Sequence, residues 1–77
     1  MEAEITFVPK DFYCPITGEL MNEPVLGKDG HSYEKSEILM WLSTNTTSPM
    51  TREPLTKDDL VENLPLKRSI EEIRDRL

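Results

Sequence analysis

Cys14 is the only cysteine in this chain of 77 residues, and His31 is its only histidine. No disulfide can form within such a chain, and a structural zinc site built from thiolates and imidazoles is excluded. Domains of this size bury a small core and often depend on a disulfide or a metal for stability. We therefore expect one domain without a cofactor, stabilised by apolar packing and by a well-satisfied network of polar groups.

The net negative charge of the chain disfavours some classes of binding partner. The chain has 15 acidic and 9 basic residues and a net charge of −6, which disfavours non-specific binding to nucleic acid. No apolar run approaches the length of a membrane span, and no signal-peptide pattern is present. A lone cysteine fits a reducing compartment. We predict a soluble intracellular protein of the cytoplasm or nucleus, with neither a membrane nor a nucleic acid as its partner.

The first half of the sequence predicts an arm, a loop and a hairpin. We expect residues 1–10 to form an N-terminal arm on a domain that comprises residues 11–77. The domain begins with a structured loop over residues 11–23, which contains Pro15 and Gly18. Two short strands follow, at residues 24–26 and 31–33, and an Asp-Gly pair between them is a strong hairpin signal.

A central helix of about 11 residues, near the average length, is predicted to begin at Ser32 or Tyr33. Glu34 and Glu37 would lie in its first turn, where negative charge suits the helix dipole. Its apolar face would consist of Ile38, Leu39, Trp41 and Leu42. The polar residues 43–48 then predict a second loop.

The last third of the sequence predicts two helices. Thr56 and Asp59 resemble a capping box, which would begin a short helix that ends near Glu62 with Asn63 as its C-cap. A final helix would follow Pro65. Its apolar positions are Leu66, Ile70, Ile73 and Leu77, and its exposed side would hold the ion pairs Arg68–Glu72 and Glu72–Arg76. Together these elements predict a small α+β domain.

Polar residues stand at the spacing of the ligands in a cross-braced two-zinc domain. Such a domain has Cys-x-x-Cys, then Cys-x-His-x-x-Cys-x-x-Cys, then Cys-Pro-x-Cys. The corresponding positions here are Cys14, Thr17, Asp29, His31, Glu34, Glu37, Ser48 and Thr51. Hydroxyls are poor zinc ligands, and one thiolate among oxygens is not a selective site. We therefore expect these residues and Asn63 to form a structural polar clamp that hydrogen-bonds loop N–H groups, with either Glu34 or Glu37 as a main acceptor.

From residue 11 to residue 77 the sequence resembles a U-box domain, the zinc-free relative of the RING finger in ubiquitin ligases. The resemblance rests on segments in family order and at family spacing, which are Cys14-Pro15-Ile16-Thr17, Glu19-Leu20-Met21, Glu23-Pro24-Val25, Gly30, Tyr33-Glu34, Ile38 with Trp41-Leu42, Pro49-Met50-Thr51-Arg52 with Leu55, and Leu60 with Asn63 and Leu66. It implies a small RING-like fold with two loops, a short β-hairpin, a central helix and a C-terminal helix. The chain departs from the family at Gly18, where some members have a second apolar contact, and at Ser48, where many have cysteine.

The resemblance implies an E3 ubiquitin ligase domain, a transferase of the RING type. U-box domains bind a ubiquitin-conjugating enzyme (E2) that holds ubiquitin as a thioester, and they position it for attack by a substrate lysine without a covalent intermediate of their own. The implied E2 contacts are Ile16, Trp41, Pro49 and Arg52. Arg52 would be the linchpin that donates hydrogen bonds to both E2 and ubiquitin, because its planar fork of donors can bridge two surfaces. The protein substrate would bind to regions beyond these residues.

Each implied contact has a plainer structural alternative. Ile16 and Trp41 could be core residues, Pro49 a simple turn residue, and Arg52 a solvated cation. The whole domain could also be a non-catalytic interaction module of the U-box shape. Homodimers occur in the family, and the apolar residues of the last helix could serve one, although we expect them to close the domain's own core.

A third hypothesis makes Cys14 a catalytic thiol that accepts ubiquitin itself. Such a thiol has to be exposed, has to have a lowered pKa and needs a nearby base. His31 is the only histidine, and the spacing places it in the other half of the clamp. We therefore expect Cys14 to be a buried structural residue.

Overall fold

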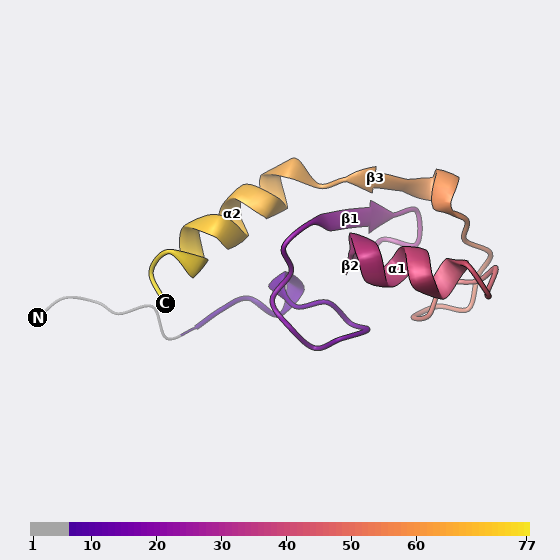
Figure 1. Cartoon of the computed structure of the whole chain (residues 1–77), viewed down its shortest axis with the longest axis horizontal. Helices are drawn as coiled ribbons and strands as arrows, with labels where there is room; N and C mark the ends of the chain where they lie inside the picture. The colour runs from indigo at the N-terminus through magenta and orange to yellow at the C-terminus, as the bar shows by residue number, and fades with distance from the viewer. Residues whose placement is uncertain (1–6) are drawn as a thin grey trace, which may run out of the picture.

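The computed structural model describes residues 7–77, so the first six residues of the predicted N-terminal arm lie outside the described range. The elements in chain order are η1 (Lys10–Phe12), β1 (Pro24–Gly27), β2 (Ser32–Glu34), α1 (Lys35–Leu42), η2 (Lys57–Asp59), β3 (Leu60–Glu62) and α2 (Leu64–Arg74). Loop 1, residues 13–23, joins η1 to β1, and loop 2, residues 43–56, joins α1 to η2 (Figure 1). The predicted α+β class, with two loops, a hairpin, a central helix and a C-terminal helix, is confirmed.

The sheet has three antiparallel strands in the order β2-β1-β3. The hairpin between β1 and β2 turns at Gly30, whose φ of 87° lies in the left-handed region that suits glycine. The third strand, β3, replaces the helix predicted to run to Glu62. The Asp59 carboxylate does accept the Thr56 N–H at 2.8 Å, as the capping box predicts, but a single 3₁₀ turn follows. The next three residues pair with β1 because the edge of that strand is free to bond them.

The two α-helices begin at other residues than predicted. Ser32 and Tyr33 remain in β2, so α1 begins at Lys35 and Glu34 precedes the helix instead of lying in its first turn. Asn63 is the N-cap of α2, not a C-cap, since its Oδ1 accepts the Leu66 N–H at 3.2 Å. The helix therefore begins before Pro65, and proline is tolerated there because the first turn needs no N–H donor.

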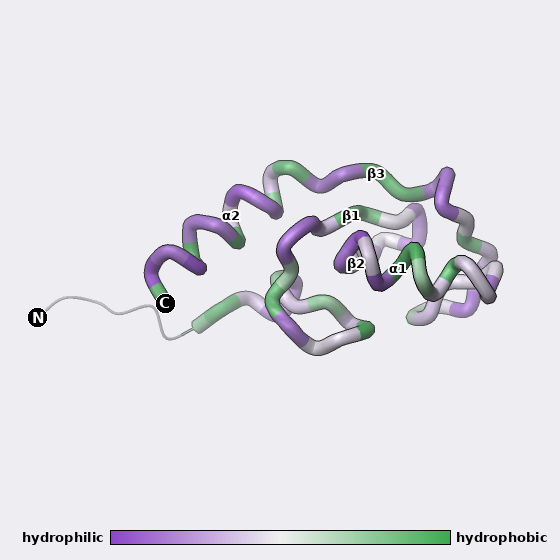
Figure 2. The backbone as a smooth tube through the Cα atoms, viewed as in Figure 1, coloured by the Kyte–Doolittle hydropathy of each residue, from purple (hydrophilic) through white to green (hydrophobic). Residues whose placement is uncertain are grey.

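The ion pairs predicted along α2 do not form. Among residues 7–77, neither Arg68–Glu72 nor Glu72–Arg76 is within salt-bridge distance, whereas Lys28 Nζ lies 3.5 Å from Asp59 Oδ2. Exposed pairs of this kind contribute little free energy, so solvation of both charges competes well with pairing. In Figure 2, α2 is mostly purple, with short green stretches where its apolar residues lie.

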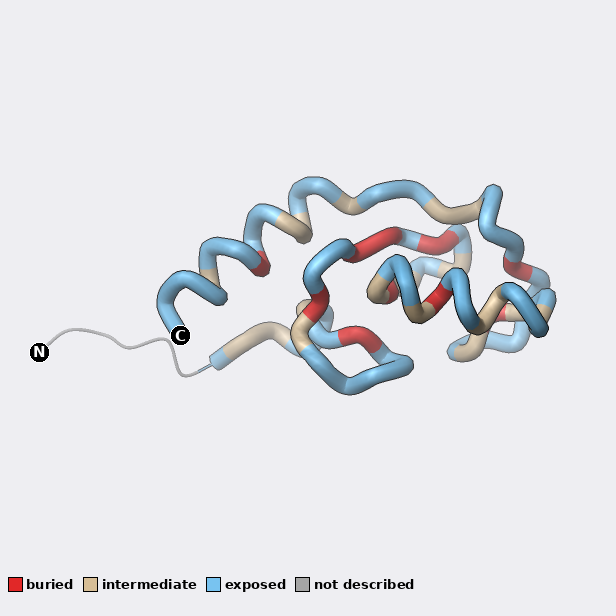
Figure 3. The backbone as a smooth tube through the Cα atoms, viewed as in Figure 1, coloured by how far each residue is buried: buried red, intermediate tan, exposed pale blue. Residues whose placement is uncertain are grey.

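One small core joins all parts of the domain (Figure 3). Its buried apolar residues are Cys14, Met21, Val25, Tyr33, Ile38, Leu55 and Ile70. Ile70 is 1% exposed and Leu66 packs against the core, so α2 closes the domain's own core as its apolar spacing predicts. Leu77, the last residue of that stripe, is 71% exposed. Neither helix within residues 7–77 has the length and apolar character that crossing a membrane requires.

Candidate functional site

Loop 1 is a tight turn with an apolar tip. The Cys14 N–H donates to the Glu19 carbonyl at 2.9 Å, and the Gly18 N–H donates to the Cys14 carbonyl at 2.7 Å. The Thr17 hydroxyl accepts the Glu19 N–H at 3.1 Å, so it bonds within the loop and not across to another element. Ile16 lies between these bonded ends and is 36% exposed. The turn therefore presents an isoleucine to solvent from a well-bonded base.

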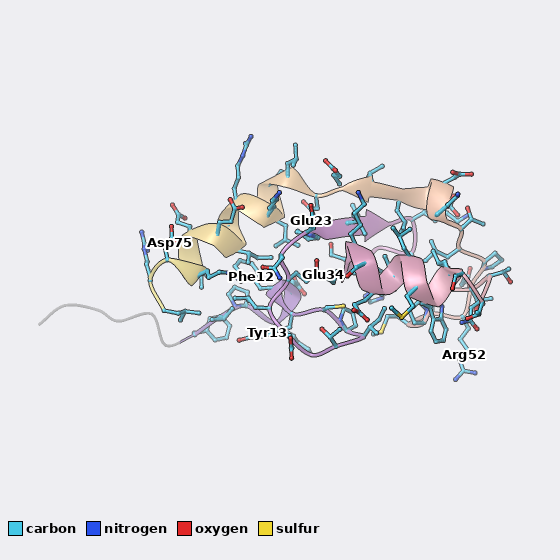
Figure 4. All side chains as sticks on the ribbon, in the orientation of Figure 1. Phe12, Tyr13, Glu23, Glu34, Arg52 and Asp75 are labelled. Carbon is cyan, nitrogen blue, oxygen red and sulfur yellow. The ribbon has the colours of Figure 1, made fainter. Side chains whose placement is uncertain are left out.

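Two acceptor side chains, which we name the loop-1 clamp, bind loop 1 to the hairpin. The Cys14 thiol sulfur accepts the N–H of Ile16 at 3.4 Å and the N–H of Glu34 at 3.3 Å. The Glu34 carboxylate accepts the N–H groups of Asn22 at 2.7 Å and of Glu23 at 2.8 Å. Figure 4 shows Glu34 facing the segment of loop 1 that carries Glu23. Cys14 and Glu34 thus hold both ends of loop 1 against the start of α1.

Three residues, which we name the loop-2 clamp, play the equivalent part for loop 2. Ser48 is 1% exposed, and its Oγ accepts the N–H groups of Met50 and Thr51, each at 3.0 Å. The buried Tyr33 hydroxyl lies 3.3 Å from that Oγ and donates to the Asp29 carboxylate at 2.6 Å. Asp29, Tyr33 and Ser48 therefore connect the hairpin turn to the tip of loop 2.

The loop-2 clamp favours the ionised form of the Asp29 carboxyl and the protonated form of the Tyr33 phenol. Partial burial raises the pKa of Asp29. The nearby Ser48 hydroxyl, the Tyr33 hydroxyl and the His31 N–H, of which the last two donate hydrogen bonds to the carboxylate, lower it more, so the net pKa is lower than usual. Burial raises the pKa of Tyr33, and the Asp29 carboxylate raises it further. At neutral pH the phenol is therefore a donor and the carboxylate an acceptor.

Several predicted clamp residues do not reach across the domain. The Thr51 hydroxyl accepts the Glu53 N–H at 3.2 Å, which is a bond within loop 2. The His31 ring lies tilted against the Tyr33 ring, with centroids 6.4 Å apart. Within residues 7–77, no hydrogen bond reaches the side chain of His31 or of Glu37. Asn63 instead connects α2 to the sheet, since its Nδ2 donates to Ser32 Oγ at 3.3 Å.

The clamp residues are not arranged as a metal centre. In the part of the chain that the structure describes, no three His, Cys, Asp or Glu side chains are grouped so that they could hold a metal ion. The acceptors of both clamps bind N–H or O–H groups. The sequence left open whether Glu34 or Glu37 is the main carboxylate acceptor. Glu34 accepts two backbone N–H groups, whereas the Glu37 side chain accepts none within residues 7–77, so Glu34 has this role.

The predicted contact residues lie on loop 1, α1 and loop 2. The half-buried Trp41 of α1 donates from its indole Nε1 to the Thr47 carbonyl at 2.7 Å, which binds the helix to loop 2. Pro49 is half-buried at the tip of loop 2. Pro15 of loop 1 and Met50 of loop 2 line the same surface hollow, so the two loop tips open to a common side.

Arg52 has the most unusual backbone in the site. Its φ of 69° lies in the left-handed region, which only a few per cent of residues other than glycine adopt. Its N–H donates to the Ser48 carbonyl at 3.0 Å, so the loop-2 clamp fixes this conformation. The side chain is exposed, and Figure 4 shows it directed away from the domain into solvent.

The structure adds two contacts that the sequence analysis did not predict. Tyr33 is the centre of the loop-2 clamp, although the ligand-like spacing passes over it. The Trp41–Thr47 hydrogen bond gives the tryptophan a structural partner as well as an exposed edge. Tyr33 is the middle residue of β2 and its partner Ser48 lies in a distant loop, so the contact is visible only in the three-dimensional structure.

Cys14 lacks the surroundings of a catalytic thiol. The residue is fully buried, and its sulfur already accepts two backbone N–H groups. His31, the only histidine, packs against Tyr33. A thioester on Cys14 would therefore require loop 1 to open and the core to be exposed.

Comparisons with known proteins agree on one family. The model of the U-box domain family matches residues 8–75. A WD repeat, SAM and U-box domain-containing protein 1 of Danio rerio is 51% identical over 63 residues, which are 80% of this chain and 13% of that protein. A "Probable bifunctional E2/E3 enzyme" of Acanthamoeba polyphaga mimivirus is 44% identical over 66 residues, which are 86% of this chain and 5% of that protein.

A solved structure supports the fold. The RING finger-like domain of Retinoblastoma Binding Protein-6 superposes with a TM-score of 0.82, covering 90% of this chain and 79% of that one at 22% sequence identity. The chain spans only a small part of the curated relatives that it matches. Since the family model covers nearly all of the described residues, the chain belongs to the U-box family.

Proposed function

We propose that this chain is a U-box E3 ubiquitin ligase domain that binds a ubiquitin-charged E2 and promotes transfer of ubiquitin to a substrate lysine. Membership of the U-box family supports the general activity, and a relative is named as an E2/E3 enzyme. The proposed E2 surface consists of Ile16, Trp41, Pro49 and Arg52. Regions outside this domain would bind the protein substrate.

The proposed mechanism needs no nucleophile from the domain. The neutral substrate amine attacks the thioester carbonyl, the carbon–sulfur bond breaks, and the sulfur of the E2 cysteine leaves as the thiolate. The nitrogen releases one proton to solvent, and an isopeptide bond remains. The domain accelerates this step by restricting a flexible E2–ubiquitin conjugate to reactive orientations. The buried position of Cys14 agrees with this division of roles.

The single observation that carries the proposal is the presentation of Arg52. A left-handed backbone at this residue is strained by about 1–2 kcal/mol relative to the right-handed form. The strain is maintained by the bond to Ser48 at the base of the turn, and it directs a guanidinium away from the domain. A strained residue with a solvent-directed arginine suits a role outside the domain better than a role in its stability. We assign to it the bridging of E2 and ubiquitin.

Ile16 would supply the apolar part of the same surface. Its loop is fixed by hydrogen bonds at both ends, so little conformational entropy is lost when a partner covers it. Gly18 adds no second apolar group, and no atom lies within 4 Å of the position that its Cβ would take. We therefore infer that Ile16 dominates the loop-1 contact, and that the range of suitable E2 proteins is narrower than in members with a side chain there.

We also propose that the two clamps replace the metal ions of zinc-containing relatives of the fold. Each hydrogen bond contributes about 1 kcal/mol net. The loop-1 clamp provides four accepted N–H groups, and the loop-2 clamp provides two together with the Tyr33 hydroxyl pair. Their sum is sufficient to hold two loops in a domain of marginal stability.

The alternative proposal is a U-box-shaped interaction module without transfer activity, including a homodimer. The missing contact at Gly18 favours it, because a weaker E2 surface could bind without supporting transfer. One experiment separates the proposals. Several E2 proteins are charged with ubiquitin, and discharge to free lysine is followed with and without the domain. Acceleration that is lost in Arg52→Ala supports the ligase, and no acceleration with any E2 leaves the interaction module.

A further inference from the structure

A contact between α2 and the end of loop 1 has no place in the clamps described above. Arg74, in the last turn of α2, donates from Nη1 to Asn22 Oδ1 at 3.0 Å and from Nη2 to the Met21 carbonyl at 2.8 Å. One guanidinium thus binds a side chain and a main-chain group of adjacent residues. Lysine could not reproduce this geometry, because the two donors of arginine are fixed in one plane.

The peptide group between Met21 and Asn22 is bonded from both sides. Its carbonyl accepts from the Arg74 guanidinium, and its N–H donates to the Glu34 carboxylate at 2.7 Å. The cation lies at the negative end of the peptide dipole and the anion at the positive end. Charged partners strengthen hydrogen bonds, and bonds on the two ends of one amide polarise each other. This peptide is therefore a strongly fixed point of loop 1.

The Met21–Asn22 peptide group also lies where the two ends of loop 1 are bonded to each other. The Met21 N–H donates to the Phe12 carbonyl at 3.0 Å, and Leu20 forms a β-bridge with Tyr13. The outgoing end of the loop is therefore bound to its incoming end, with the buried Met21 side chain beneath. A shift of this segment would move the whole turn that presents Ile16.

The contact belongs to Arg74 and not to the arginines in and just after α2 in general. Arg68 and Arg76 are also exposed, and within residues 7–77 the side chain of neither makes a hydrogen bond or an ion pair. The two hydrogen bonds place the last turn of α2 beside the end of loop 1. Arg76, which lies two residues beyond the end of α2, therefore offers a matched control of the same residue type and charge.

We propose that Arg74 is a positioning residue that holds loop 1 in the conformation in which Ile16 meets the E2. This inference rests on the proposed ligase function for its consequence, but its structural part can be measured separately. Through Arg74, α2 supports the partner-binding surface as well as the core. The expected consequence is weaker binding of charged E2 when the contact is lost, with the transfer step itself unaffected.

Amide hydrogen exchange tests the structural part without any ligase assay. The variants are Arg74→Ala, Asn22→Ala, their combination, and Arg76→Ala as the control. Asn22→Ala removes a single exposed acceptor, so it is informative even if Arg74→Ala is poorly folded. We expect faster exchange at the Cys14 and Gly18 amides in the first three variants. Exchange at the Met50 and Thr51 amides of loop 2 should remain as in the unaltered domain. Equal exchange in Arg74→Ala and Arg76→Ala, or equally faster exchange in both loops, would overturn the proposal.

A titration of discharge rate against charged E2 tests the consequence. We expect the half-maximal concentration to rise about three- to tenfold in Arg74→Ala, which is the size expected for the net contribution of one hydrogen bond. The maximal rate should be unchanged. The effects of Arg74→Ala and Asn22→Ala should not add in the double variant, because both remove part of one contact. A fall in maximal rate at constant half-maximal concentration, or full additivity, would contradict the assignment. If the unaltered domain accelerates no discharge, the ligase proposal fails, and the exchange experiment alone decides whether Arg74 positions loop 1.

Discussion

The buried hydroxyl of Tyr33 donates a 2.6 Å hydrogen bond to the Asp29 carboxylate, and the same oxygen lies 3.3 Å from Ser48 Oγ. This places one aromatic side chain between the hairpin turn and loop 2, where it acts in both the core and the polar network. Its ring fills the core beside Ile38, and its hydroxyl satisfies polar groups that burial would otherwise leave unpaired. The loop that carries Pro49 and Arg52 therefore depends on a residue with no direct contact to a partner.

Removal of that hydroxyl should destabilise the domain. Tyr33→Phe keeps the ring but leaves Asp29 without its shortest donor, so the free energy of unfolding should fall by about 1–3 kcal/mol. Urea denaturation followed by Trp41 fluorescence measures the change. The control is Tyr13→Phe, since Tyr13 is 40% exposed and its hydroxyl has no hydrogen bond within residues 7–77. Equal stability of the two variants would show that the loop-2 clamp contributes nothing.

The depressed pKa of Asp29 predicts a pH-dependent contribution to stability. Burial raises this pKa, but the Ser48, Tyr33 and His31 donors lower it below the ordinary 3.8. The folded state thus favours the ionised carboxylate. Its contribution is complete above pH 3.8 and is lost as the pH falls through the lower folded-state pKa.

Asp29→Asn should reveal this contribution as a difference from the unaltered domain. The variant should be less stable by about 1–2 kcal/mol at neutral pH, and the difference should shrink toward about pH 2. Asp59 also has a lowered pKa, because the Thr56 N–H donates to it, so the comparison has to be made between variants and not from one curve. A difference that is constant with pH would contradict an ionised role for Asp29.

The sequence predicts the fold class because most of its elements depend on local patterns. The Asp-Gly turn and most of the apolar face of α1 follow from residue spacing, although Leu39, expected on that face, is 37% exposed. Strand β3 was missed because Leu60–Glu62 is only three residues long and exists through its pairing with β1. The roles of Tyr33 and Arg74 were missed for a similar reason, since Ser48 lies 15 residues from Tyr33 and Met21 lies 53 residues from Arg74 in the chain. Polar contacts between residues far apart in the chain produce no regular spacing of residues that a sequence analysis could detect.

Because the loop-1 clamp consists of hydrogen bonds, we expect the stability of the domain not to depend on metal chelators. Cys14 and Glu34 bind backbone N–H groups directly, so removing divalent metal should take nothing from loop 1. The melting temperature should change by less than about 1 °C in the presence of a strong zinc chelator. Elemental analysis of the purified domain provides the control. A drop of many degrees, or stoichiometric zinc, would contradict the prediction.

Substitution of Arg52 should lower ubiquitin discharge without lowering the stability of the domain. Its φ of 69° is free of strain for glycine, so Arg52→Gly should keep or raise the free energy of unfolding by up to about 1 kcal/mol. The same variant should lower ubiquitin discharge at least about tenfold, because the bridging guanidinium is lost. Arg52→Lys, which keeps the charge but loses the fork, should remain well below the unaltered domain. A stable Arg52→Gly domain with full activity would exclude the linchpin role.

Ile16 should contribute to binding far more than to stability. The side chain is 36% exposed at the tip of loop 1, and Leu26, on the sheet beside Val61, is 37% exposed and is a control of similar size. Ile16→Ala should weaken binding of E2 about tenfold or more, as truncation of a central apolar contact does. Leu26→Ala should leave the affinity unchanged, although both variants lose some stability. Calorimetric titration with an uncharged E2 measures the affinity. Equal losses of affinity in the two variants would mean that loop 1 is not the contact, since exposure alone does not distinguish them.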